Sequence, residues 1–115
     1  MVPEDAQVIY QIANLYDLLD DNAQAAEWFK ILHGLVPSDP KVLARLAALN
    51  SKDNDDLQAF HNYMESYHYY PVNMEVIAWL GVWYVKNQVY QEALQFFQRA
   101  AEIEPSDVKF SALRF

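Results

Sequence analysis

Apolar residues recur at the 3.6-residue spacing of an α-helix in six stretches of the chain. Short polar segments at 20–22, 52–55 and 86–88 divide these stretches into three pairs. The pattern therefore predicts an all-α chain. The expected helices are near 6–19, 23–36, 40–51, 56–70, 74–87 and 90–103.

A proline recurs every 34 residues, and an Asp or Asn follows each proline two positions later. The prolines are Pro3, Pro37, Pro71 and Pro105, followed by Asp5, Asp39, Asn73 and Asp107. The chain thus divides without gaps into repeats 6–39, 40–73 and 74–107, each with a first helix (A) and a second helix (B). Proline ends helix B, and the Asp or Asn is a good N-cap for the next helix A. Asp21 and Asp55 are expected to cap the first two B helices in the same way.

Equivalent columns of the three repeats hold the same kind of side chain. We number the 34 positions of each repeat as columns. Column eight holds Ala13, Ala47 and Gly81, column twenty holds Ala25, Ala59 and Ala93, and column twenty-four holds Phe29, Tyr63 and Phe97. Small residues allow helices A and B to approach closely, and the aromatic ring fills the wider space beside them. The predicted core is Ile12, Leu15, Tyr16, Ala25, Phe29, Leu46, Leu49, Ala59, Tyr63, Leu80, Tyr84, Ala93 and Phe97.

This pattern resembles the tetratricopeptide repeat. That repeat has a 34-residue period, with a small residue at column eight, alanine at column twenty, an aromatic residue at column twenty-four and proline at column thirty-two. Residues 79–105 match that pattern closely, whereas Asn50 and Ser66 replace a usual aromatic residue and a usual alanine. The resemblance implies an α-solenoid of three stacked helix-turn-helix repeats within one domain, 1–115. We expect 108–115 to begin a further, truncated repeat with a partial helix, so that the chain is a piece of a longer array.

The charge balance narrows the range of partners. The chain has a formal net charge of −8, and its eight Lys and Arg residues are scattered singly. Nucleic acids and anionic membrane surfaces both require clustered basic side chains, so neither is an expected partner. No apolar run is long enough to cross a bilayer, so membrane insertion is not expected. The absence of cysteine excludes disulfides and thiol chemistry.

Metal binding is one alternative, since His61, Glu65 and His68 lie at i, i+4 and i+7 of one predicted helix. Their columns usually face solvent, which favours a polar helix face over a metal-regulated domain. Residues 53–64 begin like a calcium loop, but Gln58 and Met64 replace the required glycine and glutamate. The sequence shows neither a phosphate loop nor a nucleophile motif, so we expect no enzyme activity and no cofactor.

Binding to another protein is the remaining function. The resemblance places the A helices on the concave side of a superhelix, where several side chains are candidates for partner contact. These are Tyr10, Asn14, Arg45, Trp79, Val82, Val85 and Lys86. An apolar stripe such as Trp79, Val82 and Val85 usually marks an interface, although a neighbouring repeat could cover it equally well. The carboxylate clamp of chaperone-binding tetratricopeptide domains is disfavoured, because Asn14 matches it but Tyr10 and Ala44 supply no charge.

Residues 9–29 and 66–85 resemble the tetratricopeptide subunit of intraflagellar transport complex B. That resemblance implies a scaffold in ciliary and flagellar assembly, with other subunits of the complex as partners. It also implies a location at the cilium, flagellum and basal body and in the cytoplasm. The alternative is a generic tetratricopeptide adaptor in another cytoplasmic assembly, and self-association of the isolated chain remains open.

Overall fold

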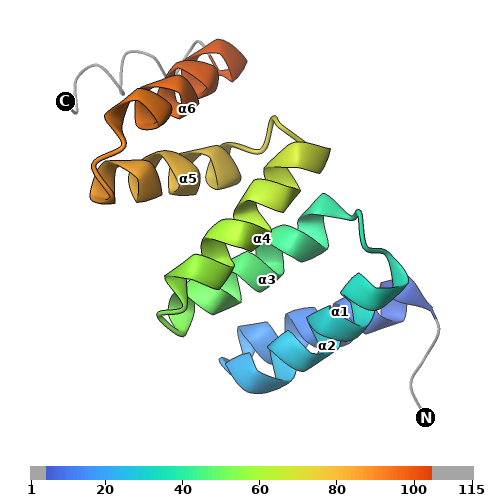
Figure 1. Ribbon diagram of the computed structural model, residues 1–115. Helices are drawn as coiled ribbons and strands as arrows, with labels where there is room; N and C mark the ends of the chain where they lie inside the picture. The colour runs from blue at the N-terminus through green and yellow to red at the C-terminus, as the bar shows by residue number, and fades with distance from the viewer. Residues whose placement is uncertain (1–4, 105–115) are drawn as a thin grey trace. The chain divides into compact units, whose positions relative to one another are not determined.

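The computed structural model of the chain describes residues 5–104, which form six α-helices (Figure 1). They are α1 (Ala6–Leu18), α2 (Asn22–Leu35), α3 (Pro40–Lys52), α4 (Asp56–Tyr69), α5 (Met74–Lys86) and α6 (Tyr90–Ile103). Every helix boundary lies within one residue of its predicted position. The predicted partial helix at 108–115 and the cap at Asp107 fall outside the described residues.

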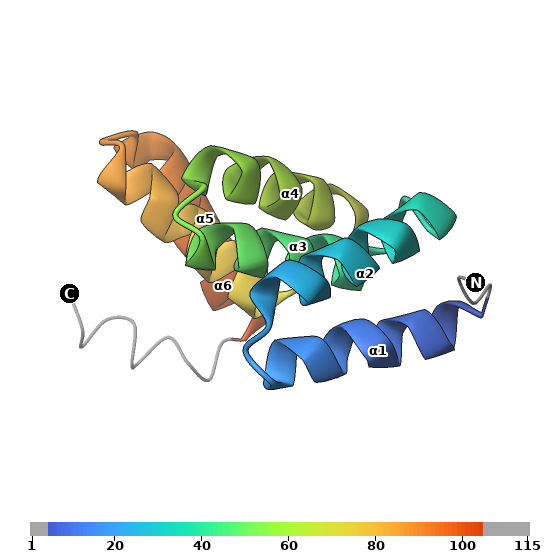
Figure 2. The same cartoon turned by 90° about the horizontal axis from the view of Figure 1, so that it is seen from below.

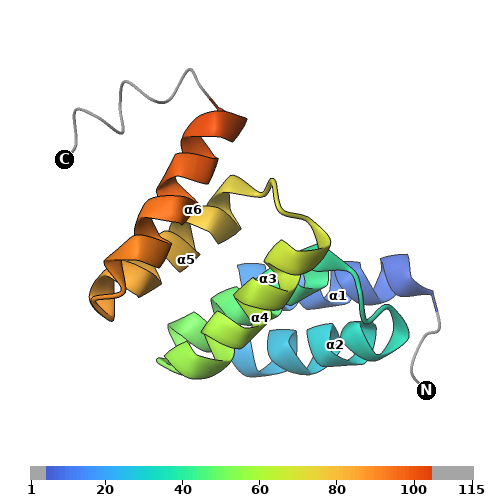
Figure 3. The same cartoon turned by 45° about the horizontal axis from the view of Figure 1, so that its top comes forward.

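The helices belong to two compact units. Helices α1 to α4 form the first unit, which ends at Tyr69, and α5 and α6 belong to the second. Within the first unit α1 packs on α2, α3 packs on α4, and α2 also packs on α3. In the second unit α5 and α6 lie side by side as an antiparallel pair (Figure 3). None of the helices in residues 5–104 is both long and apolar enough to cross a membrane.

The predicted caps are confirmed at the start of all three A helices. Oδ1 of Asp5 accepts a hydrogen bond from the backbone N–H of Gln7 at 2.9 Å, and Asp39 does the same for Lys41 at 2.9 Å. Oδ1 of Asn73 accepts from Glu75 at 3.0 Å. The first two B helices are capped in the same way. Oδ1 of Asp21 accepts a hydrogen bond from the backbone N–H of Gln24 at 3.2 Å at the start of α2, and Oδ1 of Asp55 accepts one from the backbone N–H of Gln58 at 3.3 Å at the start of α4. These bonds satisfy backbone donors that a helix leaves unpaired in its first turn.

A residue with left-handed backbone conformation follows each A helix, two positions after its last helical residue. Asp20 and Asn54 have φ of 60°, and Gln88 at the equivalent position has φ of 62°. After α1, the N–H of Asp21 donates to the carbonyl of Tyr16 at 2.9 Å, and the N–H of Asp20 donates to Asp17 at 3.0 Å. This is the Schellman arrangement, and it fixes the turn between A and B.

Gln88 is the least suitable of the three residues for its backbone conformation, because only glycine and, less well, Asn and Asp tolerate this region. We expect Gln88→Gly to raise the free energy of unfolding by about 0.5–1 kcal/mol. Asn54→Gln, the reverse change at the equivalent position, should lower it by a similar amount. Urea unfolding followed by circular dichroism measures both, and a destabilised Gln88→Gly would contradict the assigned turn.

The core of the first unit joins α1, α2 and α3. Its buried side chains are Ile9, Ala13, Ala25, Phe29, Leu32, Val42, Leu46 and Leu49. Ala25, Phe29, Leu46 and Leu49 were in the predicted core, and the other four residues of the cluster were not.

 The prediction of Leu15 as a core residue is wrong, because its side chain is 55% exposed. Ile12 and Tyr16 are half-buried.

Two polar residues that depart from the tetratricopeptide pattern are accommodated by hydrogen bonds in the first unit. Nδ2 of Asn62 donates to Oδ1 of Asn50 at 2.8 Å, which joins α4 to α3. The hydroxyl of Ser66, which is 1% exposed, donates to the carbonyl of Pro40 at 2.8 Å. A buried hydroxyl is tolerated when it has such a partner, so neither substitution opens the packing of α3 on α4.

The second unit has its own buried side chains along α5 and α6. They are Val76, Ile77, Leu80, Gly81, Ala93 and Phe96. The rings of Tyr84 and Phe96 stack with their centroids 5.6 Å apart. The predicted core residues Tyr84 and Phe97 are half-buried, and Phe96 is the buried aromatic residue of α6.

Candidate partner-binding surfaces

Three predicted contact residues of the first unit meet around one guanidinium group. Nη1 of Arg45 on α3 donates to the hydroxyl of Tyr10 at 3.2 Å, and Nη2 donates to Oδ1 of Asn14 at 2.9 Å. Nη2 also lies 2.7 Å from Oδ2 of Asp17, with which it forms an ion pair. The side chains of Tyr10, Asn14 and Arg45 therefore tie α1 to α3, and much of their hydrogen-bonding capacity is used inside the unit.

Asp17 also pairs with a second cation. Nζ of Lys52 lies 3.1 Å from Oδ1 of Asp17. Burial by itself would raise the pKa of the Asp17 carboxyl, but the hydrogen bonds from Arg45 and Lys52, together with their charges, outweigh it, and the pKa lies below its ordinary value. Asp17 is therefore ionised at neutral pH and neutralises part of the positive charge of α3.

The guanidinium of Arg45 also packs over aromatic rings. Its carbon lies 5.0 Å from the ring centre of Phe29 and 5.9 Å from that of Tyr10. The two rings themselves meet edge to face, with centroids 5.8 Å apart. Because Phe29 is fully buried, it forms the floor on which Arg45 is held.

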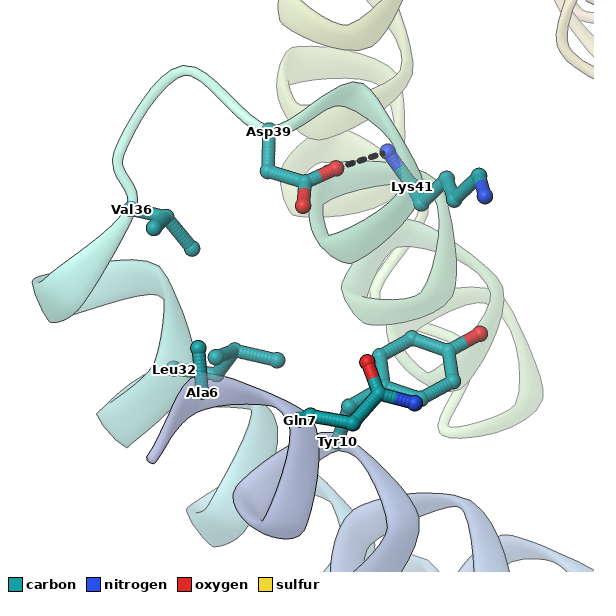
Figure 4. A pocket seen from close by; sticks show the side chains of 7 residues that line it. All are labelled: Ala6, Gln7, Tyr10, Leu32, Val36, Asp39 and Lys41. Carbon is teal, nitrogen blue, oxygen red and sulfur yellow. Dashed lines mark hydrogen bonds between the residues drawn. The ribbon is translucent and has the colours of Figure 1, made fainter. Parts of the chain in front are cut away.

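A pocket of about 270 Å³ lies beside this group, where α1, α2 and the start of α3 converge (Figure 4). It is lined by Ala6, Gln7, Tyr10, Leu32, Val36, Asp39 and Lys41. Ala6, Leu32 and Val36 make its apolar part, and the Asp39 carboxylate is held by its cap bond to the N–H of Lys41. The side chain of Lys41 extends away from Leu32 and Val36 (Figure 4). The pocket is smaller than a typical small-molecule site and has room for one apolar side chain of a partner.

The other predicted contact residues lie on α5 in the second unit. Val82 and Val85 are each 45% exposed, Lys86 is exposed, and Trp79 is half-buried. We call these four residues the α5 face. Val82 and Val85 lie outside the buried side of α5, so a partner protein can contact them.

The residues of the metal hypothesis are spread along α4. His61 is exposed and lines a shallow polar groove of about 490 Å³ together with Glu65 and His33, whereas the ring of His68 packs against Tyr69 with centroids 5.2 Å apart. Within residues 5–104 no three His, Cys, Asp or Glu side chains converge on a point where a metal ion could bind. The polar helix face is the interpretation that this geometry favours.

Solved structures with the same arrangement of helices identify the fold. A crystal structure of MamA matches with a TM-score of 0.79 at 17% sequence identity, over 91% of this chain and 61% of that chain. The first TPR domain of Spaghetti (RPAP3), bound to the HSP90 peptide SRMEEVD, matches with a TM-score of 0.77 at 16% identity, over 99% of this chain and 94% of that chain. The chain folds as three tetratricopeptide repeats.

The TPR domain of Arabidopsis OM64 is a third similar structure, with a TM-score of 0.74 at 17% identity over 87% of this chain and 83% of that chain. The chain thus spans about three-fifths of the MamA chain and most of the two separate tetratricopeptide domains. No protein-family model matches the sequence. At these identities the likeness concerns the fold of the repeats.

Sequence reasoning missed part of the first-unit site. Asp17 and Lys52 lie on the A helices that carry the predicted contact residues. The prediction neither named them as site residues nor paired Asp17 with Arg45 and Lys52. Their signal is the spacing: Asn14 and Asp17 lie three residues apart on α1, and Arg45 and Lys52 lie seven apart on α3, so each pair shares a helix face. The sequence carries no signal for the pocket, because the pocket depends on how α1, α2 and the start of α3 pack together.

Proposed function

We propose that this chain is a non-catalytic protein-binding domain whose α5 face contacts a partner protein. The observation that carries the proposal is the exposure of Val82 and Val85, each 45%, on one side of α5 next to Trp79 and Lys86. Apolar side chains that stay exposed in register on a folded helix, with a charged residue at the border, are characteristic of an interaction site.

The pocket of the first unit is a second surface that suits a protein-binding function, separate from the α5 face. It offers an apolar floor at Ala6, Leu32 and Val36 with Gln7 and Lys41 at its border. One buried apolar side chain contributes about 1.5–3 kcal/mol when it leaves water. A partner segment with an apolar anchor residue fits this site better than a strongly charged one.

An acidic peptide of the kind bound to the RPAP3 domain is not the ligand that we propose. Arg45 and Lys52 already share Asp17, so part of the positive charge of α3 is neutralised within the unit. An acidic ligand would have to compete with a carboxylate that is only 18% exposed and held by two ion pairs.

The α5 face can be tested in the full-length protein within its native assembly. We expect Val82→Asp with Val85→Asp to remove the chemical cross-links that Lys86 forms with a partner subunit, measured by mass spectrometry. Leu94→Asp is the matched control, since Leu94 is 54% exposed on α6 of the same unit. Unchanged Lys86 cross-links in the double variant would exclude the α5 face as the contact surface.

The assembly that we propose is intraflagellar transport complex B, in which the chain would form part of the tetratricopeptide subunit known as Polaris. The support is the sequence resemblance of residues 9–29 and 66–85. In this role the domain is a scaffold that holds other subunits for ciliary assembly and cargo transport. A generic tetratricopeptide adaptor shares the same fold and differs in where the whole protein resides.

Localisation of the tagged full-length protein separates these two roles. Accumulation at the basal body and along the cilium, with cross-links to other subunits of the complex, supports the ciliary role. A protein that stays in the cytoplasm of ciliated cells and copurifies with another assembly supports the adaptor instead.

A further inference from the structure

The polar groove of about 490 Å³ in the first unit is lined by side chains of α2, α3 and α4. Figure 2 shows α2 and α4 beside α3, on which both of them pack. We call this hollow the α2–α4 groove. It shares no lining residue with the pocket of Figure 4, and the α5 face belongs to the other unit. The groove is therefore a surface that the function proposed above does not use.

The carboxylate of Glu65 is an unused acceptor in the α2–α4 groove. The side chain of Glu65 is half-buried and takes part in no ion pair or hydrogen bond among residues 5–104. Asp55 brings a second carboxylate to the groove, and Lys30 brings an ammonium that lies 3.5 Å from the carboxylate of Glu27, which offsets part of its charge. A half-buried carboxylate without a partner is stabilised when a cation binds to it.

An apolar floor lies opposite the stretch of α4 that carries Glu65. Asn62 of α4 bonds to Asn50 of α3, and Ser66 bonds to the carbonyl of the first residue of α3, so the two helices run antiparallel with these levels aligned. Leu46 lies between the two bonded positions of α3, as Glu65 lies between those of α4. Leu46 is 6% exposed and lines the groove. The groove thus combines a carboxylate with an aliphatic surface.

Two amide oxygens add further acceptors to the same groove. Nδ2 of Asn62 donates to Oδ1 of Asn50 at 2.8 Å, and Nε2 of Gln58 donates to Oδ1 of Asn62 at 3.4 Å. Each amide oxygen can accept one more hydrogen bond. Several acceptors around one carboxylate suit a planar guanidinium, which has five N–H donors, better than a compact ammonium. The methylene groups of an arginine side chain also suit an apolar floor.

We propose that the α2–α4 groove binds an arginine side chain of a partner protein. The guanidinium pairs with the Glu65 carboxylate and reaches the amide oxygens of Asn50 and Asn62, while the aliphatic stem lies over Leu46. The net charge of −8 attracts a basic partner and disfavours a second copy of the chain. This contact lies in the first unit and is independent of the contact proposed for the α5 face.

Two capped tripeptides test this site. Each has alanine on both sides of a central residue, which is arginine in the first peptide and citrulline, an uncharged residue of nearly the same shape, in the second. Nuclear magnetic resonance of the nitrogen-15-labelled whole chain follows the side-chain amide signals of Asn50, Asn62 and Gln58. We expect the arginine peptide to shift these signals with a Kd on the order of 1 mM. The citrulline peptide should leave them unchanged at the same concentration.

Variants of the chain assign the binding to the groove. Glu65→Gln should weaken the arginine peptide about tenfold, because it removes the charge that the guanidinium meets. Asp56→Asn is the matched control, since Asp56 is exposed on α4, does not line the groove and carries the same charge. It should change the Kd by less than about twofold. Thermal unfolding should show both variants folded, because Glu65 loses no partner within the unit.

Four results would overturn the proposal. The arginine peptide shifts no amide signal of the groove, the citrulline peptide shifts the same signals equally, or Glu65→Gln binds the arginine peptide as well as Asp56→Asn does. The fourth comes from sedimentation equilibrium, where a dimer that Glu65→Gln dissociates and Asp56→Asn does not would make a second copy the occupant.

Discussion

Phe29→Ala should lower the free energy of unfolding by about 3–5 kcal/mol, the range expected when a fully buried large aromatic side chain is truncated. Phe29 is 0% exposed and lies in the cluster that joins α1, α2 and α3. Its removal leaves a cavity that the surrounding helices fill only in part. The loss should be large compared with the total stability of a small domain.

The same change should loosen the contact between α1 and α3. Phe29 supports the guanidinium of Arg45 at 5.0 Å and meets the ring of Tyr10 edge to face. Urea unfolding gives the stability, and hydrogen exchange in residues 6–52 shows where protection is lost. Leu57→Ala, at a side chain that is 77% exposed, is the control and should change the stability by less than about 0.5 kcal/mol. A loss below about 1 kcal/mol for Phe29→Ala would contradict the described core.

The two glycines of the chain should respond in opposite directions to replacement by leucine. A Cβ atom at Gly81 would lie 2.8 Å from Cε2 of Phe97, so a side chain there must displace the Phe97 ring that packs between α5 and α6. We expect Gly81→Leu to lower the free energy of unfolding by about 1–3 kcal/mol. At Gly34 a Cβ atom meets nothing within 4 Å, and leucine is the better helix former, so Gly34→Leu should raise the stability by up to about 1 kcal/mol.

The comparison of the two variants separates packing from helix propensity, because each replaces a helical glycine by the same residue. Thermal and urea unfolding of both proteins measures the difference. If Gly81→Leu proved as stable as Gly34→Leu, the close approach of α5 and α6 at column eight would be wrong.

The helix boundaries were predictable because they depend on local chemistry. Asp5, Asp39 and Asn73 cap helices through bonds to N–H groups two or three residues away, and such bonds need no knowledge of the tertiary structure. The left-handed residues were not predicted, although their segments were recognised as polar breaks. Asp and Asn fit that conformation, but Gln88 carries no local signal for it.

The faces of the A helices were harder to predict, because periodicity shows which residues share a side but not what covers it. Leu15 has the pattern of a core residue, and its equivalent Leu49 is buried, yet only Leu49 has α2 beside it. Arg45 was likewise predicted to contact a partner, but its hydrogen bonds to Tyr10, Asn14 and Asp17 depend on the placement of α1 relative to α3. Long-range neighbours of this kind cannot be read from the spacing along one helix.

The Schellman turns between helices A and B all have the same short length. Three residues separate α1 from α2, α3 from α4 and α5 from α6, and in the first two of these turns the last residue both completes the end of one helix and caps the next. One inserted residue would separate these two roles, so that one residue could no longer both close the first helix and cap the second. A turn of fixed length between the helices of each repeat accords with the 34-residue spacing, which runs through the three repeats without a gap.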